Sequence, residues 1–182
     1  MNNFYFLNLN IPLFKEGITV SDLPTKPVAV IDKEKIINEK IFDFFTSLNL
    51  KILFVETFYK SSNIPGFIHS DVTGGDFTKL NWVIGGGESQ MIWYRPKSNL
   101  NKKVSVNMAG SPSLRFAESE VEEIERTPIA YPAVVQVGIP HNVINVTENR
   151  YCISFIFLNQ DNSRPTMQDS VKIFKNYLIS RE

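Results

Sequence analysis

The sequence has few of the residues that would place it in several common classes of protein. Its 182 residues include one cysteine and two histidines. No run approaches the roughly eighteen apolar residues that a membrane-spanning helix needs. The N-terminal stretch MNNFYFLNLNIPLF lacks the basic region of a secretion signal. A lone cysteine cannot form a disulfide within the chain, which fits a reducing compartment. We therefore expect a cytoplasmic protein that does not enter a membrane.

The chain also has no excess of charge of either sign. Its 19 Lys and Arg balance its 19 Asp and Glu, and the sequence pI is about 6.7. Proteins that bind nucleic acids usually show a basic excess or a basic stripe that neutralises phosphates. The lysines of 97–103 lie among asparagine and serine, which is typical of a solvated loop. We expect no nucleic-acid partner, and the length suits one domain covering 1–182.

The hydrophobic pattern predicts a chain of short strands with a helix near each end. Apolar residues at helical spacing predict helices at 35–48, with Asp32 as its N-cap, and at 167–179. The polar segment 95–130 is expected to be irregular, with a short acidic helix at 118–126. This arrangement favours a mainly β fold, a sandwich or barrel with flanking helices. Period-two patterning and turn residues predict strands at 4–10, 51–59, 66–72, 78–84, 89–94, 133–137, 142–146 and 151–158.

Both histidines fall within or at the start of predicted strands. His69 and Asp71 are two residues apart, so their side chains point to the same face of a strand. His141 opens a strand 72 residues after His69. Two imidazoles and one carboxylate occupy one face of an octahedral iron(II) and leave three adjacent positions open. The pattern predicts a metal site made by His69, Asp71 and His141.

Arg150 follows His141 by nine residues, with a predicted turn at 145–149 between them. We expect the two strands to form a hairpin, which would place Arg150 roughly 7–13 Å along the partner strand at about 3.3 Å per residue. The guanidinium group is always charged and binds carboxylates in a bidentate manner. Arg150 is therefore predicted to hold the far carboxylate of a keto-acid whose other end binds the metal.

At these residues the sequence resembles the 2-oxoglutarate/iron(II) dioxygenase superfamily, whose signature is HxD, a distal His, and an Arg or Lys on the following strand. The resemblance runs from Tyr59 to Leu158. The surroundings of His69 are similar to the prolyl-hydroxylase branch. Those of His141 and Arg150 are similar to the phytanoyl-CoA and aspartyl hydroxylase branches. The resemblance implies a double-stranded β-helix, a cupin-like jelly roll.

The resemblance also implies cofactors and chemistry. Iron(II) would be held by the triad, 2-oxoglutarate would be the co-substrate anchored by Arg150, and ascorbate would serve as a reductant. The implied reaction couples oxidative decarboxylation of 2-oxoglutarate to hydroxylation of an unidentified substrate, a protein side chain or a small metabolite.

Three further residues are expected at the co-substrate. In the prolyl-hydroxylase branch a tyrosine at the position of Tyr59 lines the co-substrate pocket. Some superfamily members carry a serine two residues after the arginine, but here Cys152 stands there, and Ser154 is the next residue on that face. Asn81, in the strand predicted at 78–84, is expected to hydrogen-bond the keto-acid.

Two alternatives remain open on sequence alone. The first is a cupin-like metalloenzyme without a keto-acid, which would leave Arg150 without a task. The second is a non-catalytic β-sandwich binding module in which the triad is accidental. Metal content separates the second from both enzymes, and 2-oxoglutarate binding separates the two enzymes from each other. Under the enzyme hypotheses, the segment 95–130 is expected to border the opening near the metal and to favour polar or anionic substrates.

Overall fold

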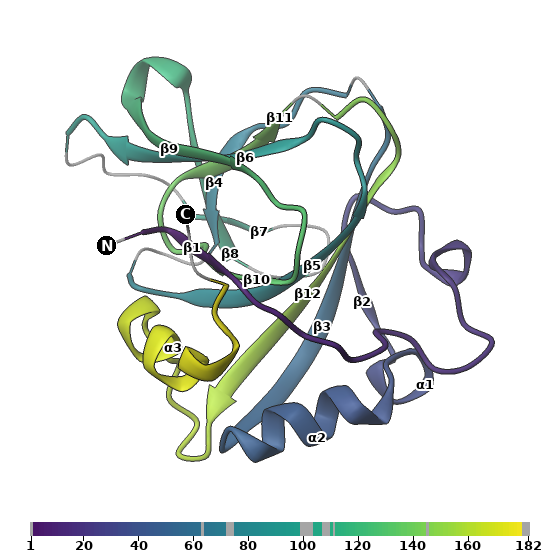
Figure 1. The fold of residues 1–182 in the computed structure, drawn as a ribbon. Helices are drawn as coiled ribbons and strands as arrows, with labels where there is room; N and C mark the ends of the chain where they lie inside the picture. The colour runs from purple at the N-terminus through teal and green to yellow at the C-terminus, as the bar shows by residue number, and fades with distance from the viewer. Residues whose placement is uncertain are drawn as a thin grey trace.

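The chain folds mainly into strands, which form two antiparallel six-stranded sheets (Figure 1). The computed structural model describes residues 2–62, 64–71, 75–98, 104–106, 110, 112–144 and 146–179. The first sheet has the order β1 (Phe4–Phe6), β10 (Ala133–Gln136), β5 (Thr78–Gly85), β12 (Arg150–Asn159), β3 (Leu50–Lys60) and β2 (Ala29–Ile31). The second has the order β7 (Ser105–Val106), β8 (Pro112–Phe116), β4 (Ile68–Asp71), β11 (His141–Ile144), β6 (Gln90–Pro96) and β9 (Val121–Pro128).

All eight predicted strands are present, although β1 and β4 are shorter than expected. Val72, Asn145 and most of the lysine-containing loop 97–103 lie outside the described residues. From β3 to β6, and again from β9 to β12, each strand lies in the opposite sheet from the one before it. Each connection therefore crosses the gap between the sheets.

The expected hairpin between the strands of His141 and Arg150 is wrong. Strand β11 pairs with β4 and β6 in the second sheet, whereas β12 pairs with β3 and β5 in the first. Residues 146–149 thus carry the chain from one sheet to the other. A turn signal in the sequence does not distinguish these two outcomes, because the choice depends on which sheet the next strand's apolar face covers.

The N-terminal helix predicted at 35–48 is divided into α1 (Lys33–Ile36) and α2 (Glu39–Ser47). Ile37 is extended and forms a bridge with Phe14, which interrupts the helix. Asn38 then restarts it, because its side chain accepts a hydrogen bond from the backbone of Lys40. The C-terminal helix α3 (Met167–Ile173) is also shorter than predicted and continues as a 3-10 turn at Lys175–Tyr177. None of the helices in the described ranges is long and apolar enough to span a bilayer.

The acidic helix predicted at 118–126 is wrong. A 3-10 turn covers Glu118–Glu120, and the following residues form the edge strand β9 along β6. The acidic side chains of β9 project from an edge strand, where pairing with β6 determines the conformation. One of them, Glu122, forms an ion pair of 2.9 Å with Arg95 of β6.

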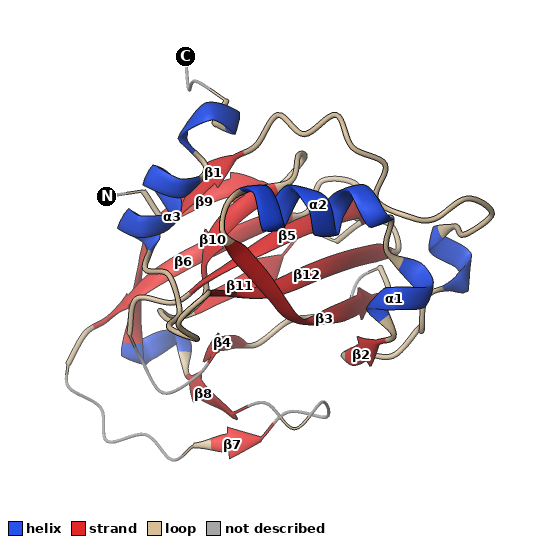
Figure 2. Cartoon of the chain, turned by 90° about the horizontal axis from the view of Figure 1, so that it is seen from below, coloured by secondary structure: helices blue, strands red, loops and turns tan. Residues whose placement is uncertain are grey.

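Two apolar cores lie on the two faces of the first sheet. On the outer face, α2 lies across the first sheet (Figure 2). Its Phe44 and Phe45 pack with Phe155 and Phe157 of β12 and with Phe174. The inner face packs against the second sheet, through a cluster that includes Phe4, Met91, Trp93, Val135 and Ile156. Alternation along β12 therefore sends the side chains of its odd-numbered residues towards the helices and those of its even-numbered residues into the space between the sheets.

We predict that Phe45→Ala destabilises the fold by about 3–5 kcal/mol, because the ring is 1% exposed and its loss leaves a cavity among four other aromatic rings. Urea unfolding measures the change in free energy. Leu53→Ala, on β3 but 47% exposed, is the control and should cost far less. Equal losses in the two variants would contradict the assignment of this core.

Candidate metal centre

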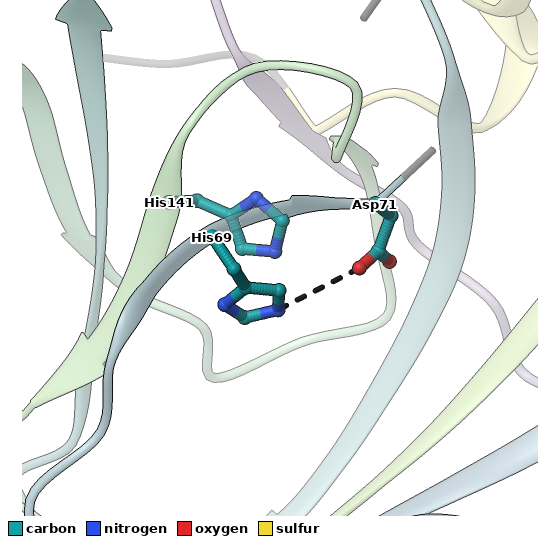
Figure 3. A group of neighbouring side chains, drawn as sticks. All are labelled: His69, Asp71 and His141. Atoms are coloured by element: carbon teal, nitrogen blue, oxygen red, sulfur yellow. Dashed lines mark ion pairs between the residues drawn. The ribbon is translucent and has the colours of Figure 1, made fainter. Parts of the chain in front are cut away.

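His69, Asp71 and His141 come together because β4 and β11 are neighbours in the second sheet. The register places His141 directly opposite His69, and the centroids of the two rings lie 4.5 Å apart. Asp71, two residues after His69, points to the same side (Figure 3). One ligand atom from each residue lies within 4.8 Å of the others. The structure thus brings the three predicted ligands into one group able to hold a metal ion.

Backbone carbonyls orient both imidazoles. Nδ1 of His69 lies 3.1 Å from the carbonyl oxygen of Phe67, and Nδ1 of His141 lies 2.9 Å from that of Ile139. A carbonyl oxygen only accepts hydrogen bonds, so Nδ1 carries the hydrogen in each ring. The lone pair of each ring is then on Nε2, and Nε2 of His69 is 3.5 Å from Oδ1 of Asp71. Such hydrogen bonds fix the tautomer and orientation that metal-binding histidines need.

Lys79 holds the second carboxylate oxygen of Asp71. Its Nζ lies 2.7 Å from Oδ2 of Asp71 and 2.9 Å from Oε2 of Glu56. Lys79 of β5 and Glu56 of β3 belong to the first sheet and Asp71 of β4 to the second, so the ion pair between Lys79 and Asp71 connects the two sheets. Sequence analysis missed Lys79 and Glu56. The sequence did contain a signal for them. Glu56 and Lys79 are charged residues in two strands that are otherwise largely apolar, β3 and β5.

The electrostatic surroundings set protonation states that suit a metal. Burial by itself raises the pKa of Asp71, but the charges of Lys79, His141 and His69 outweigh it and hold the pKa at about 2. Burial, helped by His69, lowers the pKa of His141 to about 4. Burial by itself lowers the pKa of Lys79, and the two carboxylates raise it above its ordinary value. At neutral pH the carboxylate of Asp71 is therefore ionised and the imidazole of His141 is neutral.

Arg150 begins β12 on the inner face of the first sheet. It is 5% exposed, and its Nε has no hydrogen-bond partner in the described part of the chain. Burial lowers its pKa, and the thiol of Cys152 lies beside it. Gly86 lies against its aliphatic part, since a Cβ there would come within 3.0 Å of Cγ and Cδ. An unsatisfied buried guanidinium nitrogen is costly and indicates a site that a ligand completes.

Lys60 adds a second cation beside Arg150, directly opposite it in the register of β3 and β12. Burial, with the nearby charge of Arg150, lowers the pKa of Lys60. Its Nζ donates to the carbonyl oxygen of Val143 at 2.6 Å. Among the described residues neither cation forms an ion pair with a carboxylate. Sequence analysis missed Lys60, because the pairing of β3 with β12 is not visible in the sequence.

The three other predicted site residues have different surroundings. Ser154 donates to Oδ1 of Asn81 at 2.6 Å, so these two buried side chains lie on the inner face but bond to each other. Tyr59 packs against Tyr151 with 4.9 Å between ring centroids. Both tyrosines are one residue away from the inward-facing pair Lys60 and Arg150, so they lie on the opposite face. The structure therefore does not bring Tyr59 to the inner side, since an odd offset along a strand reverses the direction of the side chain.

Part of the described segment 95–130 lies beside the strand that carries His69 and Asp71. Strand β8 pairs with β4, with Arg115 opposite His69 and Ser113 opposite Asp71. The guanidinium of Arg115 lies 4.1 Å from the ring centroid of Phe67, which is 52% exposed beside His69. The later part of the segment, β9, lies at the other edge of the same sheet.

Comparison with known proteins identifies no relative of this chain among protein-family models or curated proteins. The geometry of the triad and of the two cations on the first sheet therefore carries the functional argument.

We predict that the protein binds one iron(II), or manganese(II) or nickel(II) in its place, per chain. His69→Ala and His141→Ala should each abolish stoichiometric binding, because two ligands leave the ion largely hydrated. Metal content after dialysis measures this, and circular dichroism checks that the variants remain folded. Asn142→Ala, next to His141 on β11, is the matched control and should keep the metal. Metal that persists in both histidine variants would refute the site.

The low pKa of His141 predicts acid sensitivity in metal-free protein. In the fold the imidazole stays neutral down to about pH 4, whereas in the unfolded chain it protonates near its ordinary value of 6.5. The unfolded state then binds more protons, so stability falls as the pH drops from 6.5 to 4, by on the order of 3 kcal/mol. Urea unfolding with a chelator, compared with His141→Asn, isolates this contribution. If the free energy of unfolding fell with pH equally in the unaltered protein and in His141→Asn, this contribution of His141 would be contradicted.

Proposed function

We propose that the protein is an iron(II)- and 2-oxoglutarate-dependent oxygenase, acting as a hydroxylase. One observation carries the proposal. Two imidazoles and a carboxylate converge on one side of the space between the sheets, and a buried arginine with an unpartnered Nε faces the same space from the other sheet. The first group suits a metal with open positions, and the second suits the carboxylate of a co-substrate.

The strand order supports the double-stranded β-helix implied by the sequence resemblance. Four neighbours in the first sheet have the order β3-β12-β5-β10, and four in the second have the order β4-β11-β6-β9. Successive strands mostly alternate between the sheets. Two four-stranded sheets connected in this way are the arrangement of a jelly roll, the architecture of the cupins. The additional strands β1, β2, β7 and β8 extend the edges of both sheets.

The residues present fit the proposed groups. His69, Asp71 and His141 would hold the iron, which when bound would supply activation of dioxygen with electrons from the decarboxylation of 2-oxoglutarate to succinate and carbon dioxide. Lys79 occupies one oxygen of Asp71 and leaves the other for the metal. Arg150 and Lys60 would bind the far carboxylate of the keto-acid, and the burial of Arg150 would limit the access of water to that contact.

The two alternatives make different use of the same residues. A cupin-like metalloenzyme without a keto-acid would use the triad but would leave Arg150 and Lys60 without a ligand. A non-catalytic sandwich would need neither the convergence of Nε2 atoms nor the unpartnered arginine nitrogen. The unsatisfied Nε of Arg150 favours the keto-acid enzyme over both.

Incubation with iron(II), ascorbate and 2-oxoglutarate should release succinate, even without the substrate, at a slow uncoupled rate. Arg150→Ala should keep the metal but weaken 2-oxoglutarate binding by about 2–5 kcal/mol, or roughly thirty-fold to several thousand-fold. Arg150→Lys should recover part of the affinity, because a point charge replaces a bidentate fork. Calorimetric titration of 2-oxoglutarate into manganese-loaded protein measures the affinity.

The control for the arginine is Arg126→Ala, which removes an exposed arginine paired with Glu123 on β9. This variant should bind 2-oxoglutarate as the unaltered protein does. If Arg150→Ala bound 2-oxoglutarate with the affinity of the unaltered protein, the proposed role of Arg150 in holding the co-substrate would be refuted. Metal binding without any 2-oxoglutarate binding would favour the cupin-like alternative, and the absence of both would favour the non-catalytic sandwich.

A further inference from the structure

A cavity of about 90 Å³ adjoins Asp71 between the two sheets. Its apolar walls are Phe54 of β3, Phe77 just before β5, Pro112 of β8 and Ile156 of β12. Apolar walls around a space of this size favour a small organic group over a cluster of ordered waters.

Of the charged residues that line the cavity, three form ion pairs with one another and one does not. Glu56, Asp71 and Lys79 line it, but Lys79 pairs with both carboxylates. Arg164, which follows β12 and is exposed to solvent, is the remaining charged residue at the cavity. Its guanidinium lies 4.2 Å from the ring centroid of Phe77, and it forms no ion pair with a carboxylate among the described residues. Stacking on an aromatic ring leaves the N–H edge of a guanidinium free to bind an anion.

The cavity and the proposed keto-acid anchor lie at different levels of the sandwich. Ile156 lines the cavity six residues after Arg150 on the same strand, a rise of about 20 Å. Asp71 contributes to both the triad and the cavity wall. A keto-acid reaching from the triad towards Arg150 therefore leaves the cavity available for a second ligand on the other side of Asp71.

We propose that this cavity binds a small carboxylic acid, with the aliphatic part between Phe54, Phe77 and Ile156 and the carboxylate on Arg164. Lys79, which holds Oδ2 of Asp71, lines the cavity, and neither histidine of the triad does. The ligand would therefore lie on the Lys79 side of Asp71, apart from the three metal ligands, and its binding does not depend on the proposed oxygenase function.

Binding of pentanoate tests the assignment without turnover. We expect NMR titration of the full chain, with manganese-free buffer containing a chelator, to show saturable binding of pentanoate. Arg164→Gln should weaken it roughly tenfold, the effect of losing a charge-assisted hydrogen bond. Pentanamide should bind weakly, and equally to the unaltered protein and to Arg164→Gln, since it lacks the negative charge of the carboxylate. Arg95→Gln, an exposed arginine paired with Glu122, is the matched control and should bind pentanoate normally.

Three results would overturn the proposal. The first is unchanged pentanoate affinity in Arg164→Gln. The second is inorganic phosphate binding as tightly as pentanoate, which would mean that the apolar walls contribute nothing to binding at the exposed Arg164. The third is displacement of pentanoate by 2-oxoglutarate in metal-loaded protein, which would merge the two sites. Failure of the oxygenase function is distinguishable, because it abolishes succinate release while Arg164-dependent pentanoate binding persists.

Discussion

The ion pair between Lys79 and Asp71 joins the two sheets at the centre of the protein. Lys79 projects from the first sheet and Asp71 from the second, and both are largely buried. A buried carboxylate without a partner would be protonated or would destabilise the fold. With Lys79 in place, Asp71 stays ionised and one of its oxygens is fixed. The position of the triad relative to the first sheet depends on this contact, because the two histidines belong to the second sheet alone.

Polar groups occupy a defined part of an otherwise apolar interior. The inner faces of β3, β5 and β12 carry Glu56, Lys79, Asn81 and Ser154, which are bonded to one another or to Asp71. Elsewhere the space between the sheets is filled by the cluster around Trp93. Buried polar groups are tolerated when each has a partner. Nε of Arg150, which has no hydrogen-bond partner among the described residues, departs from this rule, and the proposed co-substrate would supply the partner.

The triad was predictable because its signal is local. His69 and Asp71 share a strand face by alternation, and the strand character of the residues around His141 is visible in their composition. Lys60, Glu56 and Lys79 were missed because their relevance depends on pairing between strands distant in the sequence. The misplaced hairpin and the false helix at 118–126 have the same cause. Short segments in this chain adopt the conformation that sheet pairing requires, and residue-by-residue patterns do not contain that information.

The charges of the metal centre, of the two cations Arg150 and Lys60, and of the cavity are best considered together. Glu56, Asp71 and Lys79 together carry a single negative charge, which a divalent metal would reverse. Arg150 is buried and Lys60 is half-buried, and they add two positive charges, whereas Arg164 at the cavity is exposed to solvent. A low-dielectric interior disfavours an excess of one sign. With a divalent metal bound, the metal centre, Arg150 and Lys60 would together carry three positive charges, and a dianionic keto-acid would offset two of them. The same electrostatics would therefore favour binding of the keto-acid after the metal, since the keto-acid removes part of a positive excess that metal binding increases.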